Sequence, residues 1–476
     1  MKDMPLWLAE DVVRLVRGRC LHEQAWCATG VSFDGAKVRP GDLFVALQTA
    51  LYDGHDAVAA AFEAGAVAAL VMRRPSHVLS GATLVFVDDT FLALQALARA
   101  ARQRVQGPVV AVAGSVGKSS VVSMLSLSLG AIGRTYVGDL GLQPRLGVVS
   151  ALANMPMESN YAFFELPLGR EGDLAMASHM LRPDVAVVTS IDVKMLDVFG
   201  SVDAQADAQA EVFEGMAPQG TVVLDRDNPY RARLASHARV CGVRSVKTFS
   251  VRARAEARAL SVALNAESSV VEAKIEGQKI SYTLNEPGAA CVKDSLAALS
   301  VAATVCGKVP ECAAALPLWR LPEGCGNTKT IALPSGGTLR LLDASRDAIP
   351  ASVEATIRSL GQRKADGRKI MVLGDMDSLG LLSPEHHMSL VPLLREQGVD
   401  FVFCCGDTVR YLYDALPAAM RGDYTPSSRD LALLVARFVG AGDLVAVQGA
   451  ESMTMDVVVD ALEALGLPHH TRASYM

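Results

Sequence analysis

The residues best suited to chemistry stand in one short stretch, Gly114-Ser-Val-Gly-Lys-Ser-Ser120. Its glycines allow backbone N–H groups to turn inward toward an anion. Lys118 is long enough to reach the β- and γ-phosphates of a nucleotide, and the Ser119 hydroxyl can ligate Mg²⁺. We therefore predict a site for a nucleoside triphosphate, with contacts from Gly114, Ser115, Val116, Gly117, Lys118, Ser119 and Ser120.

Elements on either side of this stretch must position it. The apolar run Val109 to Ala113 predicts a buried parallel strand, and Val121 to Leu129 predicts a helix packed under the sheet. The N-terminus of that helix adds partial positive charge to the loop. A strict P-loop has a further glycine where this chain has Val112, so the motif alone is a weak signal. The strand before it and the helix after it supply the context that a chance match lacks.

A second candidate group is the carboxylate of Glu165, which ends the apolar run Tyr161 to Leu166. Parallel strands end in polar residues where they meet a ligand crevice. A carboxylate on an apolar strand costs several kcal/mol when it is buried without a partner, so a bound cation is one explanation. A surface-facing or salt-bridged Glu165 is the alternative. We predict that Glu165 and Ser119 hold Mg²⁺ and that Lys118 and Glu165 are the catalytic pair.

Composition narrows the class of protein. Half of the 476 residues are hydrophobic and a fifth are charged, which is ordinary for a globular protein. The net charge of −6 and the lack of a Lys/Arg-rich run argue against a nucleic-acid partner. The nine cysteines include no CxxC pair, and Cys404-Cys405 lies in an apolar run that predicts buried strand thiols. Without a signal-peptide core or a run of ~20 apolar residues, we expect a cytoplasmic, reduced protein with no membrane span.

The pattern of elements predicts an α/β protein of three domains. Residues 1–105 form a small N-terminal α/β domain, 106–314 a central P-loop domain, and 315–476 a Rossmann-like domain. A β-hairpin is expected within 262–284. Predicted helices are Asp11–Val16, Ala57–Ala64, Leu92–Arg104, Ser295–Val305, Pro350–Leu360 and Met455–Leu465. Further predicted strands are Val67–Met72, Val185–Ser190, Thr221–Leu224, Val246–Val251, Leu339–Leu342, Lys369–Gly374, Phe401–Cys405 and Leu444–Gln448.

In this order the pieces resemble the Mur ligase family along nearly the full length, and most of all its D-alanyl-D-alanine-adding branch. The resemblance rests on several separate motifs. They are Arg39-Pro-Gly-Asp-Leu-Phe-Val-Ala-Leu47, Tyr52-Asp-Gly-His-Asp56, Ala113 to Ser119, Phe164-Glu-Leu166, Leu181 to Thr189, Phe199-Gly-Ser201, Glu211-Val-Phe-Glu-Gly215, Val372 to Met376, Leu379-Gly380, Gly442-Asp-Leu-Val445 and Gly449.

The resemblance implies amide formation driven by ATP, in which a substrate carboxylate attacks the γ-phosphate and an amine attacks the acyl phosphate. Positioning and charge neutralisation by lysine and Mg²⁺ carry most of such a rate. The resemblance also implies a ribose contact at Asp343. Substrate contacts are implied at Ser32, Asp34, Asp53 and His55, although a lone His55 is more often a loop histidine. The carboxylate and amine substrates stay unknown.

The chain departs from the family pattern around the second metal. The family has Asn and His where Ser190 and Met195 stand, and a carbamylated lysine that binds the second Mg²⁺ where Gln209 stands. Met195 cannot ligate hard Mg²⁺, and Gln209 cannot carry a carbamate. Asp207, two residues along the predicted helix, points elsewhere. Asp192 comes from the same loop and is free to approach the metal, but no pattern requires it.

Other departures affect the nucleotide and substrates. The His-Asn…Asn near the adenine is Ala290-Cys291…Asp294, and the Gly-Arg at the third-domain entrance is Gly324-Cys325. The run after Asp343 reads Arg346-Asp347-Ala-Ile349 in place of Tyr-Asn-Ala-Asn. Where the family has a late Lys-Gly-Ser, this chain has Gln448-Gly-Ala450. Where the family has the uridine-binding Asp-Ser-Arg, this chain has Asp34-Gly-Ala36.

Two interpretations stay open on these residues. One is a working ligase with a rebuilt metal site and changed substrates. The other is a catalytically inactive Mur-ligase fold that serves as a binding or scaffolding subunit for a protein partner. A generic P-loop kinase is less suitable, because it does not account for the flanking domains. Lys118 and Glu165 predict nucleotide binding under both interpretations, while Asp34-Gly-Ala36 predicts weak binding of UDP-linked substrates.

Overall fold

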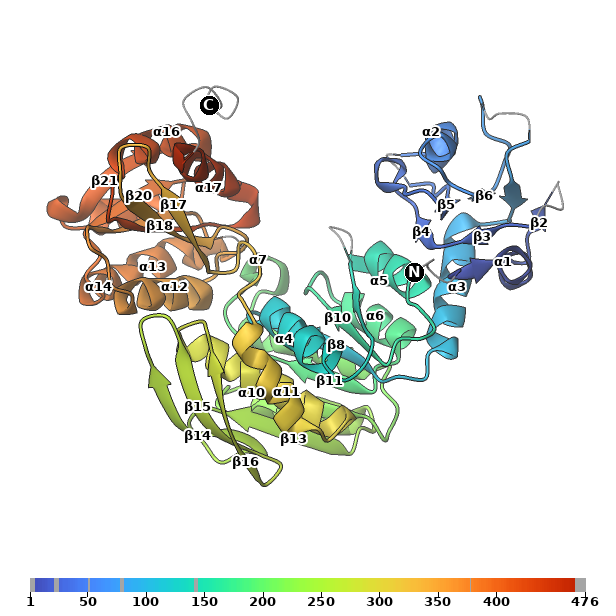
Figure 1. The fold of residues 1–476 in the computed structure, drawn as a ribbon, viewed down its shortest axis with the longest axis horizontal. Helices are drawn as coiled ribbons and strands as arrows, with labels where there is room; N and C mark the ends of the chain where they lie inside the picture. Colours follow the sequence, from blue (N-terminus) through green and yellow to red (C-terminus); the bar gives the residue numbers. More distant parts are fainter. Residues whose placement is uncertain are drawn as a thin grey trace.

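Three large β-sheets follow one another along the chain, and each belongs to a separate α/β unit (Figure 1). The computed structural model describes residues 5–20, 25–49, 52–77, 81–140, 144–376 and 378–466. The ends of the outer predicted domains, residues 1–4 and 467–476, lie outside this part. In Figure 1 the first and third units stand at opposite ends of the central unit. The three-domain α/β architecture predicted from the sequence is confirmed.

The first unit holds a five-stranded sheet in the order β2-β7-β6-β5-β4. Strands β5 and β6 in its middle are buried throughout, in keeping with their apolar residues from Leu43 to Val45 and from Ala68 to Val71. The Asn154 amide joins this unit to the central one, because it bonds both the N–H and the carbonyl of Val31, each at 2.8 Å. The elements are α1 (Ala9–Val16), β2 (Arg19–Cys20), β4 (Gly30–Ser32), β5 (Asp42–Val45), α2 (Val58–Glu63), β6 (Ala68–Val71), β7 (Leu84–Phe86) and α3 (Thr90–Arg104), with a small pair of β1 (Trp7–Leu8) and β3 (Cys27–Ala28).

The central sheet has nine strands in the order β16-β15-β14-β13-β12-β11-β8-β10-β9. Strand β8 (Val109–Ala113) lies between β10 and β11, with helices on both faces. Val110 and Val112 face α4, while Val109, Ala111 and Ala113 face the opposite side. The strands are β9 (Thr135–Gly138), β10 (Tyr161–Glu165), β11 (Val185–Val188), β12 (Thr221–Asp225), β13 (Ser245–Ser250), β14 (Ala257–Leu264), β15 (Ser269–Ile275) and β16 (Gln278–Leu284). The helices are α4 (Lys118–Gly130), α5 (Pro144–Ala153), α6 (Asp173–Leu181), α7 (Leu196–Phe199), α8 (Val202–Ala210), α9 (Arg231–Val240), α10 (Ala289–Val305) and α11 (Val309–Ala315).

The third unit has a six-stranded sheet in the order β17-β18-β22-β19-β20-β21. Helices α12 and α14 pack on one face, and α16 and α17 pack on the other. Cys404 and Cys405 are both fully buried on opposite faces of β20, as predicted for strand thiols. The elements are β17 (Asn327–Ala332), β18 (Thr338–Ala344), α12 (Pro350–Gln362), β19 (Lys369–Gly374), α13 (Ser383–Met388), α14 (Leu390–Glu396), β20 (Phe401–Cys405), α15 (Arg410–Ala415), β21 (Arg421–Thr425), α16 (Ser428–Phe438), β22 (Leu444–Gln448) and α17 (Asp456–Glu463).

Two sequence predictions need correction. The hairpin expected within 262–284 is a three-stranded antiparallel meander, because β14 already begins at Ala257. Helix α10 begins at Ala289, six residues before the predicted Ser295, so Asp294 is helical. Lys293 and Asp294 interrupt the apolar pattern between Val292 and Ser295, so the pattern alone did not extend the helix back to Ala289. In the described part of the chain, no helix is both long enough and apolar enough to cross a bilayer.

Candidate nucleotide site

The loop between β8 and α4 has the shape that a phosphate cradle requires. Gly114 has a φ of +128° and Gly117 a φ of +85°, both in the region that favours glycine. A Cβ added at Gly114 would lie 2.2 Å from the Thr189 Oγ1, and one added at Gly117 would lie 2.6 Å from an Asp294 carboxylate oxygen. Both glycines are therefore needed for shape and space. Helix α4 begins at Lys118, so its free N–H groups point toward the loop.

Lys118 folds back over this loop. Its Nζ donates to the carbonyl oxygens of Gly114, at 3.1 Å, and Ser115, at 3.4 Å. Burial lowers the pKa of Lys118, and the nearby Lys194 lowers it further, while Glu165 and Asp347 oppose this change. Among the residues that the structure describes, the ammonium thus has only neutral carbonyl acceptors, which an anion can replace. Lys118 lies where a phosphate-binding lysine is expected.

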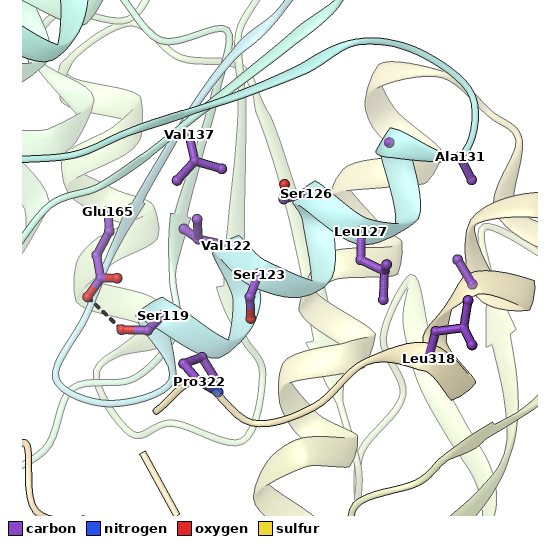
Figure 2. Close-up of a pocket in the computed structure, with 12 residues that line it drawn as sticks. Ser119, Val122, Ser123, Ser126, Leu127, Ala131, Val137, Glu165, Leu318 and Pro322 are labelled. Atoms are coloured by element: carbon purple, nitrogen blue, oxygen red, sulfur yellow. Dashed lines mark hydrogen bonds between the residues drawn. The ribbon is translucent and has the colours of Figure 1, made fainter. Parts of the chain in front are cut away.

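Ser119 and Glu165 meet at the head of α4. Strand β10 pairs with β8 so that Glu165 lies opposite Val112, and the Ser119 Oγ donates to Glu165 Oε1 at 3.0 Å (Figure 2). This arrangement places two hard oxygen donors side by side, and their role as Mg²⁺ ligands stays a prediction. Within the described ranges, no group of three or more His, Cys, Asp or Glu side chains is arranged to hold a metal. The pair fits one Mg²⁺, which commonly takes one or two protein oxygens with phosphates and waters.

The side chain of Gln209, on α8, lies against the phosphate loop at Gly114. Its side chain is fully buried, and its Oε1 accepts from the Gly114 N–H at 3.0 Å. The Nε2 has no hydrogen-bond partner among the described residues. Nearby, the Ser190 Oγ accepts from the Val116 N–H at 3.3 Å. Neutral side chains that bond the loop's own backbone therefore stand at the two positions where the family has a carbamylated lysine and an asparagine.

Asp207 and Asp192, the two acidic residues considered as replacement ligands for the second Mg²⁺, each lie near a basic side chain. Asp207 binds Arg233 with both oxygens, each at 2.6 Å, and also contacts His237, so it points away from the loop as expected. The Asp192 backbone bonds the Ser115 hydroxyl. Although burial opposes it, the carboxylates of Asp225, Asp294 and Asp192 raise the pKa of Lys293. The Asp192 charge is thus an electrostatic neighbour of Lys293.

The entrance of the third unit reaches this site. Burial raises the pKa of the Cys325 thiol, Arg346 opposes that rise, and Glu165 and Asp343 add to it. Arg346 also donates its N–H to the Gly324 carbonyl at 3.1 Å. A guanidinium therefore lies beside Cys325, the position where the family pattern has an arginine. The chain therefore has an arginine at this point of the fold, but it comes from position 346 and not from position 325.

Asp343 is the penultimate residue of β18, and its carboxylate already has hydrogen-bond and ion-pair partners. It is buried, and its Oδ1 accepts from the Ser345 N–H and hydroxyl at 3.2 and 2.7 Å. The Oδ2 lies 3.5 Å from the Lys329 Nζ. A ribose contact through Asp343 stays a prediction.

The predicted substrate residues of the first unit lie in two turns. The Ser32 Oγ donates to the Asp34 carbonyl, and the Asp34 Oδ1 accepts from the Ala36 N–H. The His55 Nε2 accepts from the Met72 N–H at 3.0 Å, so the ring proton is on Nδ1 and is donated to Asp53 at 2.6 Å. Both ring nitrogens of the buried His55 are thus used internally. These bonds fit the loop-histidine alternative, and a substrate contact from His55 stays a prediction.

A cavity of about 770 Å³ runs beside α4 (Figure 2). Ser119 and Glu165 form its polar end, and the rest of the wall is mainly apolar. The other labelled lining residues are Val122, Ser123, Ser126, Leu127, Ala131, Val137, Leu318 and Pro322. The space next to the expected metal ligands is therefore open to a small molecule.

Three family models match successive parts of the chain. The Mur ligase family catalytic domain matches residues 28–103, the Mur ligase middle domain 112–302, and the Mur ligase glutamate ligase domain 346–451. Two relatives named UDP-N-acetylmuramoyl-tripeptide–D-alanyl-D-alanine ligase are similar over most of their length. The protein of Escherichia coli (strain K12) is 29% identical, with 92% of this chain and 94% of the relative covered. That of Bacillus subtilis (strain 168) is 27% identical, with 95% and 97% covered.

Solved structures share the fold. MurF from Acinetobacter baumannii superposes with a TM-score of 0.83 at 22% identity, covering 97% of this chain and 100% of that one. MurF from Thermotoga maritima, in complex with ADP, superposes with a TM-score of 0.74 at 20% identity, covering 91% and 97%. Because family models match all three units in order and the MurF relatives align from end to end, the chain belongs to the Mur ligase family and is MurF-like.

Proposed function

We propose that this protein binds ATP with one Mg²⁺ and acts in the cytoplasm as an ATP-dependent carboxylate–amine ligase with a rebuilt nucleotide site. The observation that carries this proposal is the joint placement of Lys118, Ser119 and Glu165 at the head of α4. The ADP complex of the Thermotoga maritima relative and the ligase names of the curated relatives support it.

In the proposed reaction, an oxygen of the substrate carboxylate attacks the γ-phosphorus and ADP leaves. The substrate amine then attacks the acyl phosphate carbonyl, inorganic phosphate leaves, and the amine loses a proton. The protein's part is positioning and charge neutralisation. Lys118 exchanges its two carbonyl acceptors for phosphate oxygens, and the N–H groups of the loop and of α4 hold the phosphates.

Mg²⁺ would be held by Ser119 and Glu165, and it would neutralise phosphate charge. A second metal held as in the family does not fit the residues present. Gln209 is neutral and bonded to Gly114, and the Met195 thioether is too soft for Mg²⁺. Loss of a metal partner typically costs ~10–100-fold. We therefore propose that this protein is not a standard cell-wall MurF.

A second candidate function is an inactive, nucleotide-binding subunit. This function is favoured by the neutral side chain of Gln209, which accepts a hydrogen bond from the Gly114 N–H of the phosphate loop and adds no charge to the site. The partner would then be another protein, and ATP would be a bound ligand rather than a consumed substrate.

Calorimetry with ATP and Mg²⁺ tests nucleotide binding. We expect the wild-type protein to bind and Lys118→Ala to lose roughly 100-fold or more, because a charge-assisted contact to phosphate is lost and the loop loses its cation. Equal heats near zero for both proteins at millimolar nucleotide would refute the proposal. ADP release with screened carboxylate–amine pairs then separates the two candidates, because only the ligase turns over.

A further inference from the structure

The buried side chain of Gln205 helps to fix the loop between β11 and α7 against the phosphate loop, together with the direct bonds between Asp192 and Ser115. Its Nε2 donates to the Asp192 carbonyl at 2.8 Å and to the Ser115 hydroxyl at 3.0 Å, and its Oε1 accepts from the Lys194 N–H at 3.1 Å. Gln205 is fully buried, so these bonds are shielded from water. The backbone of Lys194 is therefore held at a set position beside Ser115.

The side chain of Lys194 extends to the third unit. Its Nζ lies 2.7 Å from the Asp347 Oδ2, across the junction of the central and third units. Both Lys194 and Asp347 act electrostatically on Lys118, together with Glu165. Two ammonium groups and two carboxylates thus gather where the nucleotide phosphates are expected. The second ammonium comes from a residue that no motif singled out.

The simplest alternative is that the ion pair only ties the two units together. Other contacts already do so without charge. The Leu196 N–H donates to the Ser378 carbonyl at 2.6 Å, and Val193 packs against the apolar core of the third unit. The Asp347 carbonyl is held by Gln448 Nε2 at 3.0 Å. These contacts hold the same loops, so holding them does not require the Lys194 charge.

We propose that Lys194 is a second phosphate-binding cation, which leaves Asp347 and contacts the terminal phosphates of ATP. This inference rests on the nucleotide binding proposed above. A triphosphate attacked by a carboxylate gathers negative charge, and this chain has neutral Gln209 against its loop and neutral Met195 where the family has a histidine. Lys194 supplies one positive charge in the same region, held on a rigid backbone. The Asp347 carboxylate is its partner when no nucleotide is bound.

Calorimetric titrations with ATP, ADP and AMP in the presence of Mg²⁺ test this proposal. We expect Lys194→Gln to weaken ATP binding by roughly 10- to 100-fold, as for the loss of a charge-assisted hydrogen bond, and to change AMP binding by less than about 2-fold. Lys194→Arg keeps the charge and should recover most of the ATP affinity. Asp347→Asn should leave ATP binding as tight or make it tighter, because Lys194 no longer has to leave an anionic partner.

Lys247→Gln is the matched control. The Lys247–Glu276 pair is 3.0 Å long with side-chain exposures of 24% and 38%, against 2.7 Å, 23% and 45% for Lys194–Asp347. Lys247 lies on β13 of the same unit, and its loss should leave ATP binding unchanged. Melting temperatures of all variants confirm folding.

The outcomes are distinct. Lys194→Gln and Asp347→Asn that weaken ATP binding equally would assign the pair to joining the units and overturn the proposal. ATP affinity unchanged by Lys194→Gln, but lost in Lys118→Ala, would overturn this inference alone. A wild-type protein that does not bind ATP would overturn both the inference and the proposed function.

Discussion

The carboxamide of Gln209 is oriented by its surroundings. The Gly114 N–H needs an acceptor, so Oε1 faces it and Nε2 is left without a partner among the described residues. A flipped amide would set two donors against each other. A buried donor without a partner costs about 1–3 kcal/mol, so its position next to a phosphate loop favours a polar ligand or water there.

Replacing Gln209 by alanine tests this contact. The Gly114 N–H loses its acceptor and a cavity opens, so we expect a loss of roughly 1–3 kcal/mol in the free energy of unfolding. Urea denaturation measures it. Gln278→Ala, at an exposed position of β16, is the control and should stay within about 0.5 kcal/mol of the wild type. Equal stability of Gln209→Ala and wild type would contradict the role given to this amide.

Asp294 makes stability depend on pH. Burial raises the pKa of Asp294 from 3.8 to about 7, and the Lys293 charge opposes this rise. The folded state therefore favours the neutral acid. The contribution of Asp294 to the free energy of unfolding is fully present below the pKa that this group has in the unfolded chain. It is lost as the pH rises through the folded-state pKa of about 7.

We expect Asp294→Asn to be more stable than the wild type at pH 8, by on the order of a few kcal/mol, with the difference shrinking toward pH 5. Thermal unfolding of both proteins at several pH values between these limits measures the trend. A difference that is constant with pH, or that grows toward pH 5, would show that Asp294 is charged in the fold.

At the scale of elements, the start of α4 depends on a glycine for two separate reasons. Gly117 and Gly172 both precede helices and have nearly the same φ, +85° and +83°. A Cβ added at Gly117 would meet the Asp294 carboxylate, whereas one added at Gly172 meets nothing within 4 Å. The two positions therefore separate backbone strain from lack of space.

We expect Gly172→Ala to cost about 1 kcal/mol through its backbone conformation alone. Gly117→Ala should cost roughly 1–3 kcal/mol more, because a buried carboxylate has to move, and it should also abolish ATP binding. Chemical denaturation and calorimetry give both quantities. Equal costs at the two positions would mean that Asp294 moves aside freely.

At the scale of the whole molecule, the predictions concern the first unit, where the family's substrate-binding motif is changed, and the overall reaction. We expect weak or no binding of UDP-N-acetylmuramoyl peptides, because Asp34-Gly-Ala36 offers no guanidinium and Asp34 is used in its own turn. We also expect no measurable ADP release with the muramoyl tripeptide and D-alanyl-D-alanine. A coupled ADP assay and a binding titration measure these quantities.

Restoring Ser190→Asn, Met195→His and Gln209→Lys together should not create that activity. Gln209→Lys removes the acceptor of the Gly114 N–H, and the third unit keeps Cys325 and Gln448. Ordinary turnover by the unmodified protein would instead show a standard MurF. Micromolar binding of the tripeptide precursor would overturn the prediction for the first unit.

The sequence by itself determined the local parts of the site. The strand–glycine–Lys-Ser–helix order depends on residues close together in the chain, so β8, the loop and α4 could be predicted. Glu165 followed from the rule that parallel strands end at a common edge, and its contact with Ser119 agrees. The tertiary structure decided the rest. Lys194 meets Asp347 from 153 residues away, and Arg346 lies beside Cys325. The first pair depends on how two units pack against each other and the second on how loops fold within the third unit, and the spacing of residues along one strand or helix specifies neither.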